Sequence, residues 1–195
     1  MIITNLGHEF FKVQLGDLTI AFNPPSKEST FKSSKFGADI VLESLSHEDM
    51  SGGADLAYGD RAPFIISGPG EYERKGIFIK GVAGASRYDL DDKDEDLINT
   101  IYSLSVDNIN LLFLGAQSRE LPAQLSDVVD EVDIVFIPIG SADGKGSGVF
   151  SPKEAYKIAM NLEAKLIIPM NFSSTKDECL KQFIIAQFCR VIRNL

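Results

Sequence analysis

Apolar residues in the first two thirds of the chain occur in short runs that are separated by turn residues. The dipeptide Gly16-Asp17 joins two such runs and is typical of a β-hairpin between residues 10–15 and 18–22. We expect the other strands of this part at residues 40–42, 64–67, 77–79, 100–106 and 110–114. The pattern therefore predicts that most of the chain is built from strands.

The last third alternates between helical and strand patterns. A helix is predicted at residues 119–129, and continuous apolar runs at 134–137 and 166–168 are typical of buried strands, the second of them ended by Pro169. Ser151 and Glu154 form a capping box that should begin a helix. A second capping box, at residues 175–178, should begin a final helix with the apolar stripe Leu180, Phe183, Ile184, Phe188, Val191 and Ile192.

Composition narrows the class of protein. The chain has 195 residues with 28 acidic and 19 basic side chains, a net charge of −9, and we expect one domain over residues 1–195. This charge argues against binding to nucleic acid or to an anionic membrane. We find neither a signal peptide nor an apolar run long enough to span a membrane. Cys179 and Cys189 suggest neither a metal pair nor a disulfide framework, so a cytoplasmic location is expected.

Two loops have compositions that suggest a binding role. Residues 89–96 contain six acids and one lysine, which is typical of either a cation-binding loop or a solvated surface loop. This segment lacks the ordered ligand spacing of a calcium loop. The glycine-rich stretch 140–148 does not have the spacing of a phosphate loop, so we expect an ordinary loop there.

Several short motifs, in this order, resemble those of a known family. They are Leu6-Gly7-His8, the apolar run ending in Asn23-Pro24, Gly68-Pro69-Gly70-Glu71-Tyr72-Glu73, Asn99-Thr100-Ile101-Tyr102 and Phe113-Leu114-Gly115-Ala116. Together with the order of strands and helices, they resemble the metallo-β-lactamase superfamily, and within it the small cytosolic metal-dependent hydrolases. The resemblance covers nearly the whole chain.

The resemblance implies an α+β fold. Its expected architecture is a four-layered αβ/βα sandwich, in which two mostly antiparallel sheets pack together and helices lie outside. The N-terminal half should supply one sheet and the C-terminal half the other. The site of such proteins lies at the open edge between the sheets. In this chain the degenerate family metal positions that should line the cleft are Leu45, His47, Asp49, Met50, Ala116 and Asn171.

The metal motif of the family is largely absent. Where relatives have Thr-His-x-His-x-Asp-His, this chain has Ser44-Leu45-Ser46-His47-Glu48-Asp49-Met50. The metal-bridging aspartate corresponds to Ala116, and a late histidine corresponds to Asn171. A catalytic zinc ion typically needs three protein ligands, and leucine and alanine can supply none. We therefore expect no metal cofactor, with zinc or another divalent metal at low occupancy on His47 and Asp49 as the alternative.

These substitutions predict a non-catalytic binding or regulatory module, whose partner is an unknown small ligand or protein, a second copy, or an active paralogue. The alternative is a metal-dependent hydrolase that binds one metal weakly or uses non-standard ligands such as Glu48, Asp49 and Asn171. A Ser-His-Asp triad around His47 is a further possibility. The alternative is that His47 and Asp49 remain from the family motif and are held by local hydrogen bonds. The resemblance implies a buried hydrogen-bonding role for His8, with an acid or base role as the alternative, and Asn23 is a further candidate.

Overall fold

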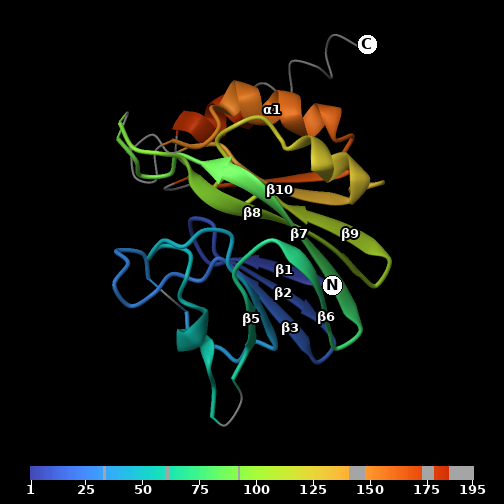
Figure 1. Cartoon of the computed structure of the whole chain (residues 1–195). Helices are drawn as coiled ribbons and strands as arrows, with labels where there is room; N and C mark the ends of the chain where they lie inside the picture. Colours follow the sequence, from blue (N-terminus) through green and yellow to red (C-terminus); the bar gives the residue numbers. More distant parts are fainter. Residues whose placement is uncertain (33, 60–61, 92, 141–147, 173–177, 185–195) are drawn as a thin grey trace.

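Two β-sheets face each other in the computed structural model of the chain (Figure 1). The structure describes residues 1–32, 34–59, 62–91, 93–140, 148–172 and 178–184. The predicted capping box at Thr175, the cysteine at position 189 and the apolar residues predicted beyond Ile184 lie outside these ranges, as do residues 141–147 of the glycine-rich stretch.

The first sheet contains the first five strands in sequence order. They are β1 (Ile2–Asn5), β2 (Phe11–Leu15), β3 (Leu18–Phe22), β4 (Ile40–Leu42) and β5 (Phe64–Ile66). Strands β1, β2 and β3 pair antiparallel, whereas β3, β4 and β5 pair parallel. The predicted hairpin is confirmed, since Leu15 pairs with Leu18 across the Gly16-Asp17 turn.

The second sheet contains six strands in the order β11-β10-β9-β8-β7-β6. They are β6 (Gly70–Arg74), β7 (Ile77–Ser86), β8 (Leu97–Val106), β9 (Ile109–Phe113), β10 (Ile134–Pro138) and β11 (Leu166–Met170). The chain passes from one sheet to the other after Ile66, which is earlier than the expected midpoint. The predicted α+β sandwich is confirmed.

The main core lies between the two sheets. Alternate residues of each strand point to one face, so the inward sets of both sheets meet. Phe22 of β3 packs against Phe113 of β9 with 4.8 Å between ring centroids, and Phe11 of β2 packs against Phe136 of β10 at 5.0 Å. Burial of each such aromatic side chain contributes roughly 1.5–3 kcal/mol, so this layer holds the sheets together.

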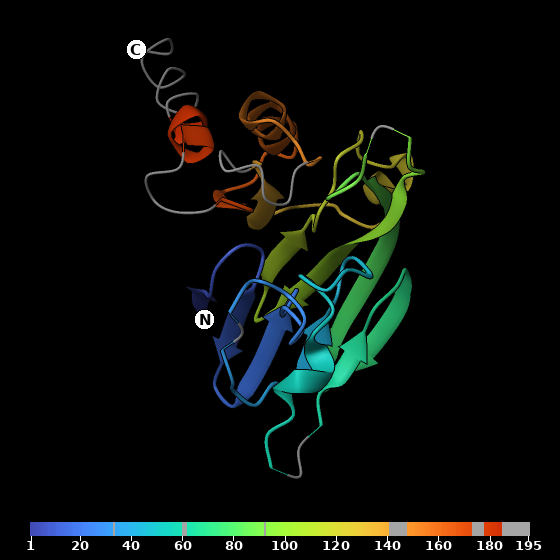
Figure 2. The same cartoon turned by 90° about the vertical axis from the view of Figure 1, so that its left-hand side faces the viewer.

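Different elements cover the outer faces of the two sheets (Figure 2). Helix α1 (Pro152–Asn161) and the helical residues 178–184 cover the second sheet, where Ala155, Ala159 and Phe183 are buried in a second apolar cluster. The predicted capping box of α1 is present between Ser151 and Glu154. Among the described residues, the first sheet is covered by a short 3-10 helix, η1 (Gly53–Leu56), and by loop residues instead of an α-helix.

Two local predictions were wrong because of proline. Residues 119–129 do not form an α-helix but contain the 3-10 helix η2 (Ala123–Asp127), because Pro122 is extended and disfavours a helical conformation at the residue before it. Strand β11 does not stop at Pro169 but continues to Met170. It lies at the edge of the sheet, where a residue without an N–H group is tolerated.

Candidate functional site

Three of the positions that resemble metal-ligand positions meet in one apolar cluster. Leu45, Met50 and Ala116 are buried together with Tyr88, and Leu97 and Val149 pack against them. Leu45 and Met50 follow β4 in the first sheet, whereas Ala116 follows β9 in the second. The ends of two sheets therefore bring these side chains together, and apolar atoms occupy the space between them.

A glycine allows the two strand ends to approach so closely. Gly115 has a φ of +58°, a left-handed conformation that glycine adopts without strain. A Cβ atom at this position would lie 2.4 Å from the Oγ atom of Ser44 and 2.5 Å from Oδ1 of Asn99. The glycine before Ala116 therefore has a packing function at this position.

The two polar residues that remain from the metal motif form hydrogen bonds with protein partners. Nδ1 of His47 accepts the backbone N–H of Asp49 at 3.2 Å, and it lies 3.5 Å from Oδ2 of the same residue. The other ring nitrogen, Nε2, lies 3.8 Å from Oδ2 of the exposed Asp89. The Oδ1 atom of Asp49 accepts the hydroxyl of Ser29. Both oxygens of Asp49 have partners, because Oδ2 accepts from Tyr88.

Tyr88 links the residues of this site to one another. Its hydroxyl donates to Oδ2 of Asp49 at 2.8 Å and lies 3.1 Å from Nε2 of His8. Burial raises the pKa of Tyr88, and the neighbouring carboxylate of Asp49 raises it further. The hydroxyl therefore stays protonated and acts as a hydrogen-bond donor, not as a phenolate. The ring of Phe31 covers the other side of His8, with 4.2 Å between ring centroids.

A buried glutamate lies beside this group. Glu9 is 0% exposed, and its Oε2 atom accepts a hydrogen bond from Nδ2 of Asn23 at 2.9 Å. The same amide group donates to Oγ of Ser44, and its oxygen accepts from the Ser44 N–H. Burial raises the pKa of Glu9 to about 8, the hydrogen bond from Asn23 opposes this change, and the charge of Asp49 adds to it. Near neutral pH the carboxyl group is therefore mostly protonated.

The remaining predicted residues are placed differently. Asn171 is completely buried, has a φ of 63° and donates its backbone N–H to the carbonyl oxygen of His8 at 3.1 Å. Ala116 is also 0% exposed, so neither residue lines an open cleft as expected. The side chain of Glu48 is exposed to solvent, whereas Asn171 is buried. This difference in exposure does not favour one metal that is held by Glu48, Asp49 and Asn171.

The contacts of the serines contradict a Ser-His-Asp triad. The hydroxyl of Ser51 donates to the backbone carbonyl of His47 at 2.7 Å, and that of Ser44 belongs to the Asn23 network. Nδ1 of His47 accepts a backbone N–H group, and within the described residues no serine hydroxyl donates to this ring, as a triad would require. The alternative of local hydrogen bonds describes the structure better.

The acidic loop is organised by an arginine. The guanidinium group of Arg87 donates through Nη1 to the carbonyl oxygen of Asp94 at 2.7 Å and to Oδ1 of Asp96 at 3.0 Å, and through Nη2 to the carbonyl oxygen of Asp91. Hydrogen bonds from Arg119 and Arg87 lower the pKa of Asp96 to about 2. The carbonyl groups that would bind a cation are therefore directed at a side chain of the protein.

The donor set does not fit a catalytic metal ion. Within the described ranges, no three histidine, cysteine, aspartate or glutamate side chains are grouped so that they could hold a metal. Leu45 and Ala116 have no ligand atom, and methionine sulfur is a soft ligand that does not suit zinc.

Tyr88, Glu9 and Arg87 were missed by the sequence analysis, because an acid after a glycine turn and a tyrosine beside an acidic run usually lie at the surface. Among the described helices, none is long and apolar enough to cross a membrane.

Comparisons with known proteins support the fold over most of the chain. Residues 2–171 match the family model of the beta-lactamase superfamily domain, whereas no curated protein matches significantly. A predicted Zn-dependent hydrolase of the metallo-beta-lactamase superfamily from Thermotoga maritima is 26% identical, with 94% of this chain and 84% of that one covered and a TM-score of 0.71. A predicted metal-dependent hydrolase from Parabacteroides distasonis is 17% identical, with 94% and 86% covered and a TM-score of 0.69. The metallo hydrolase Igni18 from Ignicoccus hospitalis is 19% identical, with 95% and 91% covered and a TM-score of 0.60.

Proposed function

The chain belongs to the beta-lactamase superfamily, and from this premise we propose that it is a catalytically inactive member that acts as a binding or regulatory module. The observation that carries the proposal is the buried cluster of Leu45, Met50, Ala116 and Tyr88. Leu45, Met50 and Ala116 lie where the motif comparison expects histidine and aspartate ligands. Apolar packing holds the two strand ends together there, in the role that metal ions have in relatives.

The chemistry of hydrolysis supports the same proposal. A metal ion activates water for attack only when protein ligands hold the ion and leave one position open. The oxygens of Asp49 already accept from Tyr88 and Ser29, and His47 accepts a backbone N–H group. A metal that bound here would have to displace these contacts, and it would gain two ligands at most from the family motif.

The alternative function is a hydrolase with a single weakly bound metal. It is favoured by the short distance of 3.5 Å between His47 and Asp49 and by the partial exposure of both side chains. This alternative predicts a measurable metal content, whereas our proposal does not.

Metal content separates the two functions directly. We expect less than a tenth of an equivalent of zinc, manganese or iron in protein that is purified without chelator and analysed by mass spectrometry of the elements. The His47→Ala variant is the matched control, because it removes the only imidazole of the motif. About one equivalent of metal in the wild type that is lost in His47→Ala would overturn the proposal and support the single-metal hydrolase.

Thermal denaturation provides a second measurement on the same samples. A ligand that binds only the folded state stabilises it, so removal of a structural metal lowers the melting temperature. We expect the same melting temperature with and without chelator, because packing of apolar side chains does not depend on an ion. We propose that the binding or regulatory role is carried out in the cytoplasm. Its partner would be a small molecule, a second copy of the chain or a related active enzyme.

A further inference from the structure

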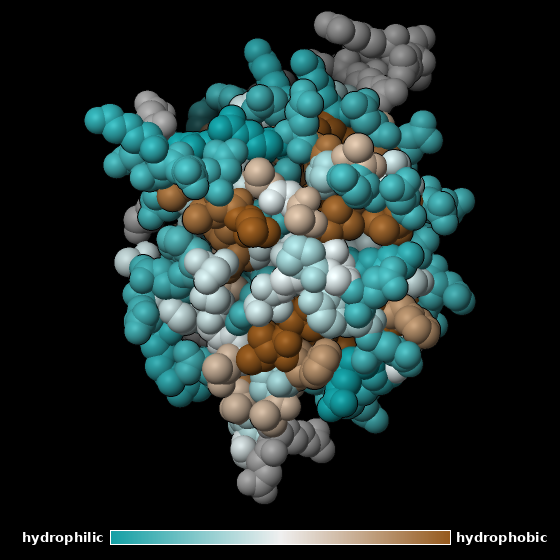
Figure 3. Space-filling view, in the orientation of Figure 1, coloured by the Kyte–Doolittle hydropathy of each residue, from teal (hydrophilic) through white to brown (hydrophobic). Residues whose placement is uncertain are grey.

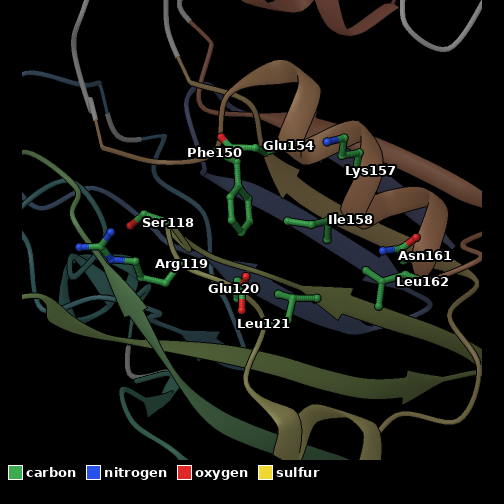
Figure 4. A pocket seen from close by; sticks show the side chains of 10 residues that line it. All are labelled: Ser118, Arg119, Glu120, Leu121, Phe150, Glu154, Lys157, Ile158, Asn161 and Leu162. Carbon is green, nitrogen blue, oxygen red and sulfur yellow. The ribbon is translucent and has the colours of Figure 1, made fainter.

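A cavity of about 460 Å³ lies outside the site described above, between α1 and residues 118–121. Figure 4 shows the side chains that line it: Ser118, Arg119, Glu120, Leu121, Phe150, Glu154, Lys157, Ile158, Asn161 and Leu162. Its volume is within the range of roughly 300–1,000 Å³ that is usual for small-molecule sites. On the face drawn in Figure 3, by contrast, the exposed hydrophobic residues form separate areas and suggest no single docking surface.

The interior of the cavity is apolar. Phe150 points into the space between α1 and the loop, and Ile158 and Leu162 of the helix side face Leu121 of the loop (Figure 4). None of these residues belongs to the degenerate metal positions. Apolar ligand atoms that enter this space lose contact with water, which favours their binding in proportion to the area buried.

The wall formed by the loop is held in place by buried hydrogen bonds. The amide of Gln117 is completely buried and donates to the carbonyl oxygens of Arg119 and Glu120, both at 3.2 Å. The hydroxyl oxygen of Ser118 accepts the backbone N–H of Arg87. A wall that is ordered before binding reduces the entropy that a ligand must overcome.

The charges at the rim indicate the head group of the ligand. Oε2 of Glu154 accepts hydrogen bonds from the N–H and hydroxyl of Ser151, so this acid is engaged in capping α1. Arg119 donates through Nε and Nη2 to Asp96 and is engaged outside the cavity. In the part of the chain that the structure describes, no carboxylate lies within ion-pair distance of the Lys157 amine, although the charge of Lys157 contributes to the lowered pKa of Glu154. Glu120 is exposed to solvent, on the loop side of the rim.

We propose that this cavity binds a single medium-chain carboxylic acid in its anionic form. Its chain would lie among Leu121, Phe150 and Ile158, and its carboxylate would pair with the amine of Lys157. The proposal gives the binding role a ligand class and to that extent rests on the proposed function. The two are tested separately, because metal content is measured at the other site and does not involve the cavity.

The size of the cavity sets the length of the chain. A water molecule takes up roughly 30 Å³ in the liquid, so about 460 Å³ corresponds to roughly 15 waters. Decanoate, which has about as many non-hydrogen atoms, should fill the cavity, whereas hexanoate should leave part of it empty. Each methylene group that is buried should tighten binding about fourfold, which corresponds to the free energy of burying one CH₂.

Isothermal titration calorimetry of the full chain with hexanoate, octanoate and decanoate tests the proposal. We expect one site per chain, an affinity that rises about fourfold per methylene, and weaker binding of decan-1-ol than of decanoate. The Lys157→Met variant should bind decanoate about fivefold more weakly, because this loss of affinity corresponds to one partly exposed ion pair. Its affinity for decan-1-ol should be unchanged. The matched control is Lys153→Met, which removes an exposed lysine of α1 outside the cavity and should have no effect.

A variant that fills the cavity separates specific binding from adsorption of a surfactant. Ile158→Trp should abolish the binding of decanoate, and its melting curve shows whether it folds. Absence of binding in the wild type would overturn the proposal, as would several sites that persist in Ile158→Trp. Equal affinities of the wild type and Lys157→Met for decanoate would overturn the choice of an anionic ligand. If Ile158→Trp does not fold, the comparison of Lys157→Met with Lys153→Met still shows whether decanoate binds at this cavity.

Discussion

Replacement of the buried Glu9 by glutamine should make the protein less sensitive to pH. Burial raises the pKa of Glu9 to about 8, from 4.5 for an ordinary glutamate. Glutamine has nearly the same shape and retains an oxygen for the hydrogen bond from Asn23, but it has no proton to lose. The variant therefore isolates the contribution of one ionisation to stability.

The sign and size of the effect follow from the two pKa values. The folded state keeps a proton on Glu9 that the unfolded state releases above pH 4.5, so stability is greatest below pH 4.5. It then falls as the pH rises towards 8, by up to about 1.4 kcal/mol per pH unit, and levels off above that. Between pH 6 and pH 8 the wild type should lose about 2 kcal/mol relative to Glu9→Gln.

Urea denaturation at several pH values between 5 and 9 measures this difference. Because other groups titrate alike in both proteins, only the difference in the free energy of unfolding is interpreted. Glu48→Gln is the matched control, since it removes an exposed carboxyl group of the same site and should follow the wild type. Parallel curves for the wild type and Glu9→Gln would refute the reasoning, because they would show that Glu9 ionises alike in the folded and unfolded states.

Two further changes test which contacts hold the site together. Tyr88→Phe removes the hydroxyl between His8 and Asp49 and should destabilise the protein by about 1–3 kcal/mol in urea, because a buried acceptor loses its partner; Tyr58→Phe, at an exposed tyrosine, is the control, and an equal loss in both would contradict this role. Restoration of the family ligands should lower the melting temperature in chelator and raise it again with zinc. That variant combines Leu45→His, Met50→His, Ala116→Asp and Asn171→His, and normal folding without zinc binding would show that these positions do not converge.

Most strands were predictable from local patterns. The hairpin around Gly16-Asp17, the buried strand at residues 40–42 and the helix that begins after Ser151 all depend on neighbours in sequence, and the structure confirms them. Strand β6 was missed because its residues Gly70–Arg74 are mostly exposed and charged. It is a strand because it pairs with β7, a partner that the local pattern does not reveal.

The chemistry of the site was predictable only in part. The apolar character of Leu45, Met50 and Ala116, at positions that resemble metal-ligand positions, is visible in the sequence, because the side chain itself determines whether a ligand atom exists. The structure decided what fills the space: Tyr88 contacts His8, a residue 80 positions away, and Asp49, which is 39 positions away. No local pattern specifies such contacts.

The sequence by itself determined the order of the elements, the family resemblance and the absence of a ligand atom in the side chains of Leu45 and Ala116, since these depend on side-chain identity and short-range backbone preference. Tertiary structure alone decided that Glu9 is buried, that Tyr88 packs in the buried cluster of the site and that the side chain of Arg87 donates hydrogen bonds to the acidic loop. The physical reason is that burial and pKa depend on atoms that folding brings from distant parts of the chain. A glutamate after a turn ionises normally in water, and only its position between two sheet ends changes its proton affinity.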